Sequence, residues 1–261
     1  MIIKVDEIFF KYTDENILDG ISFEVDKPEV IGVLGSNGAG KSTLFGLLLK
    51  LLKAQSGDIF INGKNTRNLN SKELAKDLAY IPQSHFPTYN YSVLNTVLMG
   101  MASRIGVFSS PREKEIKKAR EILGDLNILH LEDRGYKTIS GGERQLALIA
   151  RAIIQDANIL IMDEPTANLD FGNQSLVMNK VVDISKKGYT ILISMHNPLH
   201  AYLYTDKVLI IHDRKIEAYG KTEEVLNEEI LKKIYGIEVE ILKAHNKKRE
   251  YQIPIPKDVS L

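Results

Sequence analysis

A glycine-rich segment, GSNGAGKST at residues 35–43, limits the possible folds of this chain more than any other stretch. It follows a short apolar run, VIGVLG at 30–35, and leads into a helical pattern that begins at Lys41. The segment matches G-x-x-x-x-G-K-[ST] in the strand–loop–helix setting of a phosphate-binding loop. Successive backbone N–H groups can surround phosphate oxygens, Lys41 adds a positive charge, and Ser42 can ligate Mg²⁺. The alternative is a glycine-rich turn without a ligand, which the lysine, the hydroxyl and the setting together disfavour.

Apolar runs and helical patterns alternate along much of the chain. Further buried strands are expected at NILIMDEP (158–165), TILIS (190–194) and KVLIIH (207–212), with helices between them. Continuous apolar strands separated by helices indicate an α/β fold with a parallel sheet covered on both faces. DIFINGK (58–64) predicts another strand that ends in an Asn-Gly turn.

Two regions depart from this alternation. Residues 92–153 contain several helical patterns in a row and no strand, which indicates a helical insertion. Within it, SPRE at 110–113 predicts a helix start, with a capping serine and proline at the first helical position. The tail, with EVEIL (238–242) and YQIPI (251–255) around a basic turn, predicts two short strands.

Composition excludes several classes of protein. With 261 residues, and roughly 150 residues per domain, the chain forms one large domain or two small ones. Lys plus Arg and Asp plus Glu both number 34, which argues against a protein that coats nucleic acid. The absence of cysteine excludes disulfides, thiolate metal sites and a cysteine nucleophile. MIIKVDEIFF at the start lacks the pattern of a signal peptide, and the most apolar stretch, GLLLKLL (46–52), is far shorter than the ~20 residues of a membrane span, so we expect a soluble intracellular protein.

Two adjacent acids end one of the expected buried strands. In ILIMDEP, Asp163 and Glu164 stand where the carboxyl end of a strand meets the rim of the sheet, and ligands bind at that rim. We expect Asp163 to hold Mg²⁺ and Glu164 to activate water as a general base. The alternative is a solvated turn before Pro165, and the phosphate loop on another strand of the same sheet favours the functional interpretation.

These motifs stand in the order found in one family, and the chain resembles the ATPase subunit of an ABC transporter over nearly its whole length. After the phosphate loop come a glutamine loop with Gln83, a signature that begins at Ser140, and the Walker B strand with its two acids. A D-loop with Asp170 and the switch histidine, His196, complete the order. No single short motif is decisive, but the complete series is very specific.

The resemblance implies the fold and the domain boundaries. We expect a P-loop NTPase of the ABC ATPase type, with a mostly parallel central sheet, an N-terminal antiparallel β subdomain and an inserted helical subdomain. A single ABC ATPase domain is expected over 1–236, with its nucleotide-binding core in 1–91 and 154–236 and the insertion in 92–153. A short C-terminal extension is expected at 237–261.

The resemblance also assigns roles to single residues. ATP is expected to contact Tyr12 and Gly35, Ser36, Asn37, Gly38, Ala39, Gly40, Lys41, Ser42 and Thr43. Mg²⁺ is expected at Ser42, Gln83 and Asp163, and catalysis at Glu164, Gln83 and His196. Ser140, Gly141, Gly142 and Glu143 are expected to hold ATP that is bound to a partner copy, with Asp170 acting across the same interface. The alternatives are a core tyrosine at 12 and ordinary loop residues at 83 and 196.

Three positions depart from the family pattern. Ile139 and Glu143 replace the usual leucine and glutamine of the signature, and Asn197 follows the switch histidine where an acid is common. Ser140 and Glu143 form Ser-x-x-Glu, a capping box that predicts a helix start at this point. A carboxylate near a nucleotide also brings like charges together, which disfavours the contact that the family's glutamine makes with the partner's nucleotide.

Segments 86–100, 105–111 and 169–174 resemble importer ATPases that serve iron–siderophore, haem, cobalamin and molybdate or tungstate permeases. The resemblance therefore implies an ATP-hydrolysing homodimer with ATP at its interface. It implies integral-membrane permease subunits as partners, an extracytoplasmic substrate-binding protein as an indirect partner, and no nucleic acid. It implies a cytoplasmic protein, peripheral on the inner face of the cell membrane, and a metal chelate as cargo, iron–siderophore foremost. The alternative is a soluble ABC ATPase without a membrane partner, such as a cluster-assembly or ribosome-associated factor.

Segment 86–104 contains more apolar side chains than one helix face can bury. A helix that starts at Ser92 can bury one stripe, either Val93, Val97 and Met101 or Leu94 and Leu98. We expect the remaining apolar residues, including Phe86, Tyr89, Tyr91 and Met99, to stay partly exposed. An exposed apolar patch usually marks a partner surface, so we expect a permease-docking groove lined by Tyr89, Tyr91 and Met99. The alternative is that the helical insertion folds over all of them.

Overall fold

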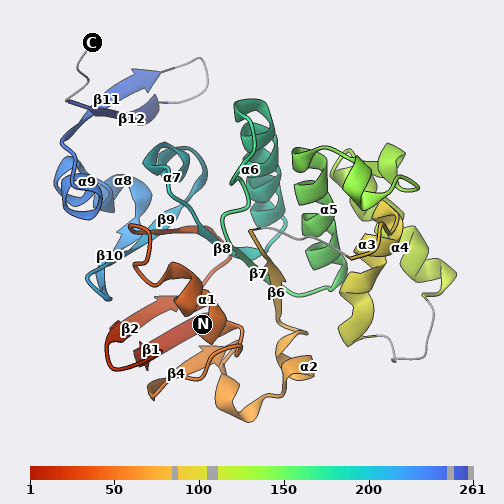
Figure 1. Cartoon of the computed structure of the whole chain (residues 1–261), viewed down its shortest axis with the longest axis horizontal. Coiled ribbons are helices and arrows are strands. Elements are labelled where there is room, and N and C mark those ends of the chain that lie inside the picture. The colour runs from red at the N-terminus through yellow and green to blue at the C-terminus, as the bar shows by residue number, and fades with distance from the viewer. Residues whose placement is uncertain (84–87, 105–110, 246–249, 258–261) are drawn as a thin grey trace. The chain divides into compact units, whose positions relative to one another are not determined.

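The computed structural model describes residues 1–83, 88–104, 111–245 and 250–257 (Figure 1). The chain divides into two compact units. The first unit consists of Met1–Asn68 and Leu192–Leu261, and the second consists of Leu69–Ile191. Phe86 and the expected capping Ser110 lie outside the described residues.

An antiparallel sheet in the first unit contains the N-terminal strands, which lie side by side in Figure 1. Its strands are, in order, β2 (Asn16–Val25), β1 (Ile3–Lys11), β4 (Ser56–Ile61) and β5 (Lys64–Asn65). Ile3 of β1 lies opposite Val25 of β2 and Ile61 of β4, and all three side chains are fully buried. Buried and exposed residues alternate along much of β2, as in a sheet with one face in the core. The expected antiparallel β subdomain is confirmed.

The larger sheet has the strand order β10–β9–β3–β8–β7–β6. Its strands are β3 (Val30–Leu34), β6 (Leu78–Ile81), β7 (Ile159–Met162), β8 (Thr190–Ser194), β9 (Lys207–His212) and β10 (Lys215–Lys221). β3 pairs with β9 in parallel and β6 pairs with β7 in parallel, whereas β10 runs antiparallel to β9. Every residue of β3, β7 and β8 is buried, which confirms the prediction of a mostly parallel sheet with buried strands.

Short helices and a C-terminal hairpin complete the first unit. The helices are α1 (Lys41–Leu48), the 3-10 helix η1 (Thr66–Asn68), α7 (Pro198–Tyr204), α8 (Thr222–Val225) and α9 (Glu228–Tyr235). The hairpin consists of the antiparallel strands β11 (Val239–His245) and β12 (Glu250–Pro256). The tail therefore forms the two strands that its sequence predicts.

Helices dominate the second unit. They are α2 (Ser71–Leu74), α3 (Val93–Leu98), α4 (Glu113–Asp125), α5 (Gly141–Ile154), α6 (Phe171–Lys186) and the 3-10 helices η2 (Met99–Ser103), η3 (Leu129–Leu131) and η4 (Tyr136–Thr138). The predicted start of α4 at Pro111 is wrong, because the helix begins at Glu113. The backbone N–H of Arg112 donates to Glu115 Oε2 at 2.8 Å, so Arg112 takes the capping position instead.

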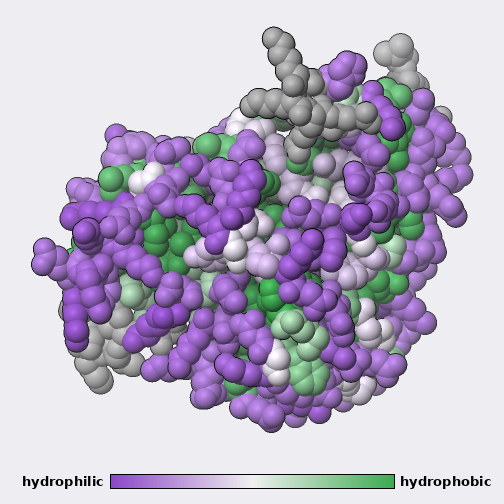
Figure 2. Space-filling view, turned by 180° about the vertical axis from the view of Figure 1, so that it is seen from behind, coloured by the Kyte–Doolittle hydropathy of each residue, from purple (hydrophilic) through white to green (hydrophobic). Residues whose placement is uncertain are grey.

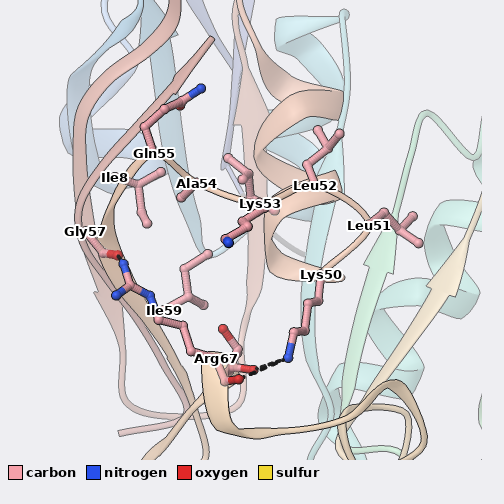
Figure 3. A pocket seen from close by; sticks show the side chains of 12 residues that line it. Ile8, Lys50, Leu51, Leu52, Lys53, Ala54, Gln55, Gly57, Ile59 and Arg67 are labelled. Atoms are coloured by element: carbon pink, nitrogen blue, oxygen red, sulfur yellow. Dashed lines mark hydrogen bonds between the residues drawn. The ribbon is translucent and has the colours of Figure 1, made fainter. Parts of the chain in front are cut away.

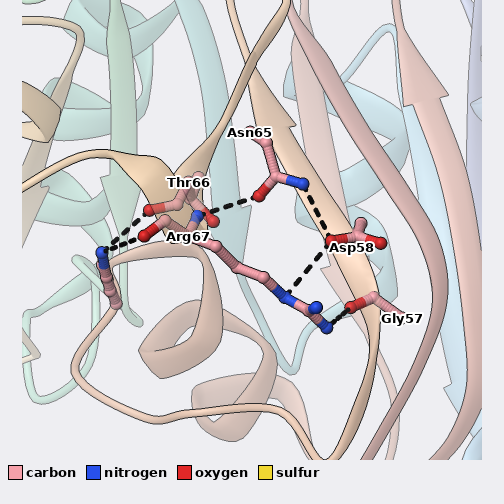
Figure 4. Close-up of polar contacts among 6 residues, drawn as sticks. Gly57, Asp58, Asn65, Thr66 and Arg67 are labelled. Carbon is pink, nitrogen blue, oxygen red and sulfur yellow. Dashed lines mark hydrogen bonds and ion pairs between the residues drawn. The ribbon is translucent and has the colours of Figure 1, made fainter.

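A set of polar contacts fastens the end of α1 to the antiparallel sheet within the first unit. Lys50 follows α1 with a left-handed φ of 57°, and its Nζ donates to the carbonyl oxygens of Thr66 at 2.9 Å and Arg67 at 3.2 Å (Figure 3). Arg67 in turn donates to the carbonyl oxygen of Gly57 at 2.6 Å, and its Nε lies 3.2 Å from Asp58 Oδ1 (Figure 4). These contacts border a cavity of about 590 Å³. Side-chain contacts therefore help to hold the connection between α1 and β4.

Charged residues make up 26% of the chain, and the surface reflects this. The face shown in Figure 2 is mainly hydrophilic, with hydrophobic residues in small separate spots. Within the described ranges, no helix combines the length and the apolar character that crossing a membrane requires.

Gly57 and Gly63 offer a matched test of this packing. Both have left-handed backbones, with φ of 82° and 75°, but a Cβ at Gly57 would lie 2.2 Å from the carbonyl oxygen of Glu7, whereas one at Gly63 meets nothing within 4 Å. Gly63→Ala should lower the free energy of unfolding by about 1–2 kcal/mol, the cost of a left-handed alanine. Gly57→Ala should lower it further, because β1 must move. Urea unfolding of both variants measures the difference, and equal losses would contradict the steric account.

Candidate functional site

The phosphate loop lies in the first unit, between β3 and α1. Its glycines permit the turn, since φ is 152° at Gly35 and 102° at Gly40. A Cβ at Gly35 would lie 2.4 Å from the carbonyl oxygen of Ile211 in β9, and one at Gly40 would lie 2.7 Å from Leu18 Cδ2 in β2. Both glycines therefore also allow the loop to pack closely on the neighbouring strands. The tip of the loop, residues 36–38, is exposed.

Lys41 places its positive charge at the phosphate loop. Its side chain is 6% exposed, and its Nζ donates to the carbonyl oxygens of Gly35 at 2.8 Å and Ser36 at 3.0 Å. Ser42, the next residue, is exposed. The ammonium group and the N–H groups at the start of α1 together favour an anion at this loop.

Tyr12 stands beside the start of α1. Its hydroxyl lies 3.4 Å from Thr43 Oγ1, and its ring packs edge-on against Phe10 with 4.8 Å between ring centroids. The side chain is 62% exposed, so Tyr12 is not a core residue. Its open ring is compatible with stacking on adenine, which stays a prediction.

A cavity of about 330 Å³ adjoins the phosphate loop and contains residues that the motifs do not identify. It is lined by residues 15–17, 36–39 and 212–214. Arg214 pairs with Glu15 at 2.9 Å, and Asp213 and Arg214 have left-handed φ values of 45° and 70° in the turn between β9 and β10. Such turns usually carry Asn-Gly or Asp-Gly, so the sequence Asp-Arg gives no signal for this one.

His196 and Asn197 follow β8 in the first unit. His196 is exposed, and its backbone carbonyl accepts a hydrogen bond from the Tyr235 hydroxyl at 3.0 Å. Asn197 caps α7, because its Oδ1 accepts from the N–H of Leu199 at 2.9 Å and Pro198 occupies the first turn. The departure from the family at Asn197 therefore has a local structural role, since an amide caps a helix as well as a carboxylate does.

The second unit brings Gln83 and Glu164 together at the ends of β6 and β7. Gln83 Nε2 donates to Glu164 Oε2 at 3.0 Å, and the N–H of Asp163 donates to the carbonyl oxygen of Ile81 at 2.9 Å. Asp163 is 9% exposed, while Glu164 has a φ of 45° that turns the chain out of the strand. Burial, and secondarily the charge of Asp163, raises the pKa of Tyr80. The hydrogen bond thus brings together two residues that separate motifs, the glutamine loop and the Walker B strand, each predict to be catalytic.

The signature opens α5 in the second unit, as predicted. The N–H of Glu143 donates to Ser140 Oγ at 3.3 Å, and the N–H of Ser140 donates to Glu143 Oε2 at 2.7 Å, which confirms the capping box. Chiefly because of the second bond, the pKa of Glu143 lies below its usual value. Gly141 and Gly142 occupy the first two helical positions, whose N–H groups have no acceptor within the helix.

The D-loop leads into α6 of the same unit. Asp170 caps this helix, since its Oδ1 accepts from the N–H of Asn173 at 2.9 Å, and this bond is the main cause that lowers the pKa of Asp170. Phe171 follows and is 80% exposed. Nothing in the local sequence distinguishes this phenylalanine from a core residue.

The expected apolar patch lies around α3 in the second unit. Ser92 caps the helix, because its Oγ accepts from the N–H of Asn95 at 3.2 Å, and Val93 and Val97 are fully buried. The exposed fractions are 67% for Tyr89, 42% for Tyr91 and 43% for Met99. Partial exposure is therefore confirmed for Tyr89, Tyr91 and Met99. The prediction that only one stripe is buried is wrong, because Leu98 is buried together with Val93, Val97 and Met101.

Comparisons with known proteins agree with the motif order. The ABC transporter family matches residues 18–167. The chain is 34% identical to the petrobactin import ATP-binding protein FpuC of Bacillus anthracis, over 94% of this chain and 90% of that protein. It is 32% identical to the molybdate import ATP-binding protein MolC of Haemophilus influenzae, over 90% of this chain and 88% of that protein. A solved structure described as a metal-chelate type ABC transporter in an inward-facing conformation is 30% identical, with a TM-score of 0.88 over 98% of this chain and 97% of that chain. The chain therefore belongs to the ABC transporter ATP-binding family, whose members are ATPases.

Proposed function

We propose that this chain is the ATP-hydrolysing subunit of an importer that takes up a metal chelate, an iron–siderophore complex foremost, through a membrane permease. The hydrogen bond between Gln83 and Glu164 carries the hydrolytic part of this proposal. It joins an amide that can orient a water molecule to a carboxylate that can accept the proton of that water. The cargo class rests on similarity to the petrobactin relative and to the metal-chelate transporter structure.

The first unit supplies the residues that bind the nucleotide. Backbone N–H groups of residues 35–43 surround the β-phosphate, and Lys41 adds its charge to the β- and γ-phosphates. Tyr12 stacks on adenine, which its 62% exposure supports. His196 donates a hydrogen bond to the γ-phosphate.

Mg²⁺ is the metal that this donor set suits. Ser42, Gln83 and Asp163 all offer oxygen atoms, the donor type that Mg²⁺ prefers, and the low exposure of Asp163 favours a carboxylate paired with a cation. When bound, the ion would neutralise charge on the β- and γ-phosphates.

The residues of the second unit act on the attacking water. Gln83 orients this water, and Glu164 accepts its proton as the oxygen attacks the γ-phosphorus. The bond to the bridging oxygen breaks, and ADP and inorganic phosphate are the products. Catalysis depends on positioning and on stabilisation of charge in the transition state.

Two copies of the chain form the functional dimer, with each ATP between the phosphate loop of one copy and the signature of the other. Ser140 is exposed at the start of α5, and Asp170 and Phe171 are exposed at the start of α6. Phe171 is 80% exposed, and burying its side chain against a partner surface would be favourable because it removes apolar area from water. The exposed signature and D-loop therefore support an interface with a second copy.

The variant Glu164→Gln tests whether Glu164 is the catalytic base. Turnover should fall by roughly a hundred- to ten-thousandfold while ATP still binds, because the amide keeps the shape of the carboxylate but cannot accept the proton. Phosphate release by the purified transporter and binding of a fluorescent ATP analogue measure the two effects. Glu223→Gln is the matched control, since Glu223 is exposed in the first turn of α8. Normal hydrolysis by Glu164→Gln would show that the base lies elsewhere.

Docking of the permease is tested by Tyr91→Asp. A charge in the apolar patch should prevent assembly with the permease and abolish transport, while the isolated subunit still binds nucleotide. Co-purification with the permease and uptake of the chelate are the measurements. Leu51→Asp is the control, because Leu51 is 72% exposed and lies in the first unit, outside the patch. Full assembly and transport by Tyr91→Asp would rule out this groove, and a native chain that retains no membrane protein would favour the soluble ATPase.

A further inference from the structure

The start of α5 touches the start of α6 at Gly142. A Cβ at Gly142 would lie 2.2 Å from Asn173 Oδ1 and 3.0 Å from Asn173 Cβ. Both residues belong to the second unit, and Gly142 is buried. The second glycine of the signature is therefore required by the side chain of Asn173, independently of any phosphate that the signature binds.

The same Asn173 side chain holds the carboxylate of Asp170. Its Nδ2 donates to Asp170 Oδ2 at 2.6 Å, and its backbone N–H donates to Asp170 Oδ1 at 2.9 Å. Both bonds lower the pKa of Asp170, so they stabilise its charged form. Charge-assisted hydrogen bonds of this length are among the stronger ones in proteins. One amide thus contacts the signature with its oxygen and positions the D-loop carboxylate with its nitrogen.

A second contact joins the same two segments. A Cβ at Gly141 would lie 3.0 Å from Leu169 Cδ2, so Leu169 packs directly against the first signature glycine. Gln174 Nε2 donates to the carbonyl oxygen of Leu169 at 2.9 Å, which ties Leu169 to α6. The signature, the D-loop and the first turn of α6 therefore form one closely packed piece.

We propose that Asn173 is a positioning residue that couples the signature to Asp170. The proposal rests on the proposed function, in which the signature and Asp170 both act on a partner copy. Closely packed groups without space between them move together, since neither can shift without displacing the other. When a phosphate of the partner's ATP binds at Ser140 to Gly142 and shifts the start of α5, Asn173 moves with it and displaces the Asp170 carboxylate. Asp170 then reaches the partner only in copies whose signature is engaged.

Asn173→Asp tests this coupling at nearly constant volume. The new carboxylate replaces the donor with an acceptor and repels Asp170, while the backbone N–H of residue 173 can still donate to the capping Asp170 Oδ1. In a Glu164→Gln background, ATP-driven dimerisation should weaken by about tenfold or more, the effect of losing a charge-assisted hydrogen bond. Sedimentation equilibrium with ATP and Mg²⁺ measures the dimer. Binding of a fluorescent ATP analogue by the monomer should stay unchanged, because the phosphate loop is intact.

Asn179→Asp is the matched control on the same helix. Asn179 is exposed, and its Nδ2 donates to the local Ser175 carbonyl oxygen at 2.8 Å, so the substitution adds the same charge without touching the D-loop. Equal weakening by both variants, or undiminished dimerisation by Asn173→Asp, would overturn the coupling. If the Glu164→Gln parent itself stays monomeric with ATP, the proposed function fails and the coupling falls with it. Asn173→Ala, which removes the side-chain donor and adds no charge, replaces Asn173→Asp if that variant does not fold.

Hydrogen exchange gives a readout that does not need the dimer. In the nucleotide-free chain, Asn173→Asp should accelerate exchange at the amides of both 141–143 and 166–170, whereas Asn179→Asp should accelerate neither. Faster exchange at only one of the two segments would show that Asn173 supports that segment alone and couples nothing.

Discussion

Strands that are buried along their whole length leave little room for polar side chains, and this constraint determines where chemistry can occur in this protein. β3, β7 and β8 contain only buried residues, and the backbone groups of sheet strands are occupied by pairing with their neighbours. Groups able to bind a nucleotide must therefore follow the strands. β3 leads into the phosphate loop, β7 into Asp163 and Glu164, and β8 into His196. Each strand thus places the proposed functional residues at its carboxyl end, where ligands bind in folds of this class.

The first N–H groups of a helix have no acceptor within the helix, and α1 and α5 differ in what these groups can bind. α1 is preceded by Gly40, which has no side chain to cap the helix, and its first N–H groups are available to phosphate. α5 is capped by its own residues, because Ser140 and Glu143 exchange hydrogen bonds. A phosphate that reaches the signature must therefore share Ser140 with an ionised carboxylate. Glu143 stabilises α5 in the single subunit. Its negative charge also repels a phosphate, so the same side chain favours the helix and disfavours binding of the partner's nucleotide in the proposed dimer.

Much of the fold could be predicted because its signals are local. Continuous apolar runs identify the buried strands, and the glycines, lysine and acids that follow them identify the site. Tertiary contacts carry no such signal. The Gly142–Asn173 contact joins segments far apart in the sequence, and the Asp213–Arg214 turn lacks its usual residues. Phe171 has the sequence character of a core residue and is exposed.

The start of α4 shows the limit of a local rule. Serine followed by proline is a strong helix-start pattern, but a Glu115 side chain that reaches the N–H of Arg112 favours a start two residues later. Both starts obey the same capping principle, and the difference lies in which carboxylate reaches which N–H group.

In the proposed dimer the signature acts on ATP held by a second copy, and disulfide crosslinking between single-cysteine subunits tests this arrangement directly. The chain contains no cysteine, so Ser36→Cys and Ser140→Cys each introduce a unique thiol. In a Glu164→Gln background, a mixture of the two variants should form disulfide-linked dimers with ATP and Mg²⁺, and far fewer without nucleotide. A mixture that gives no crosslink under these conditions, while a chain that carries both cysteines crosslinks within itself, would contradict the account.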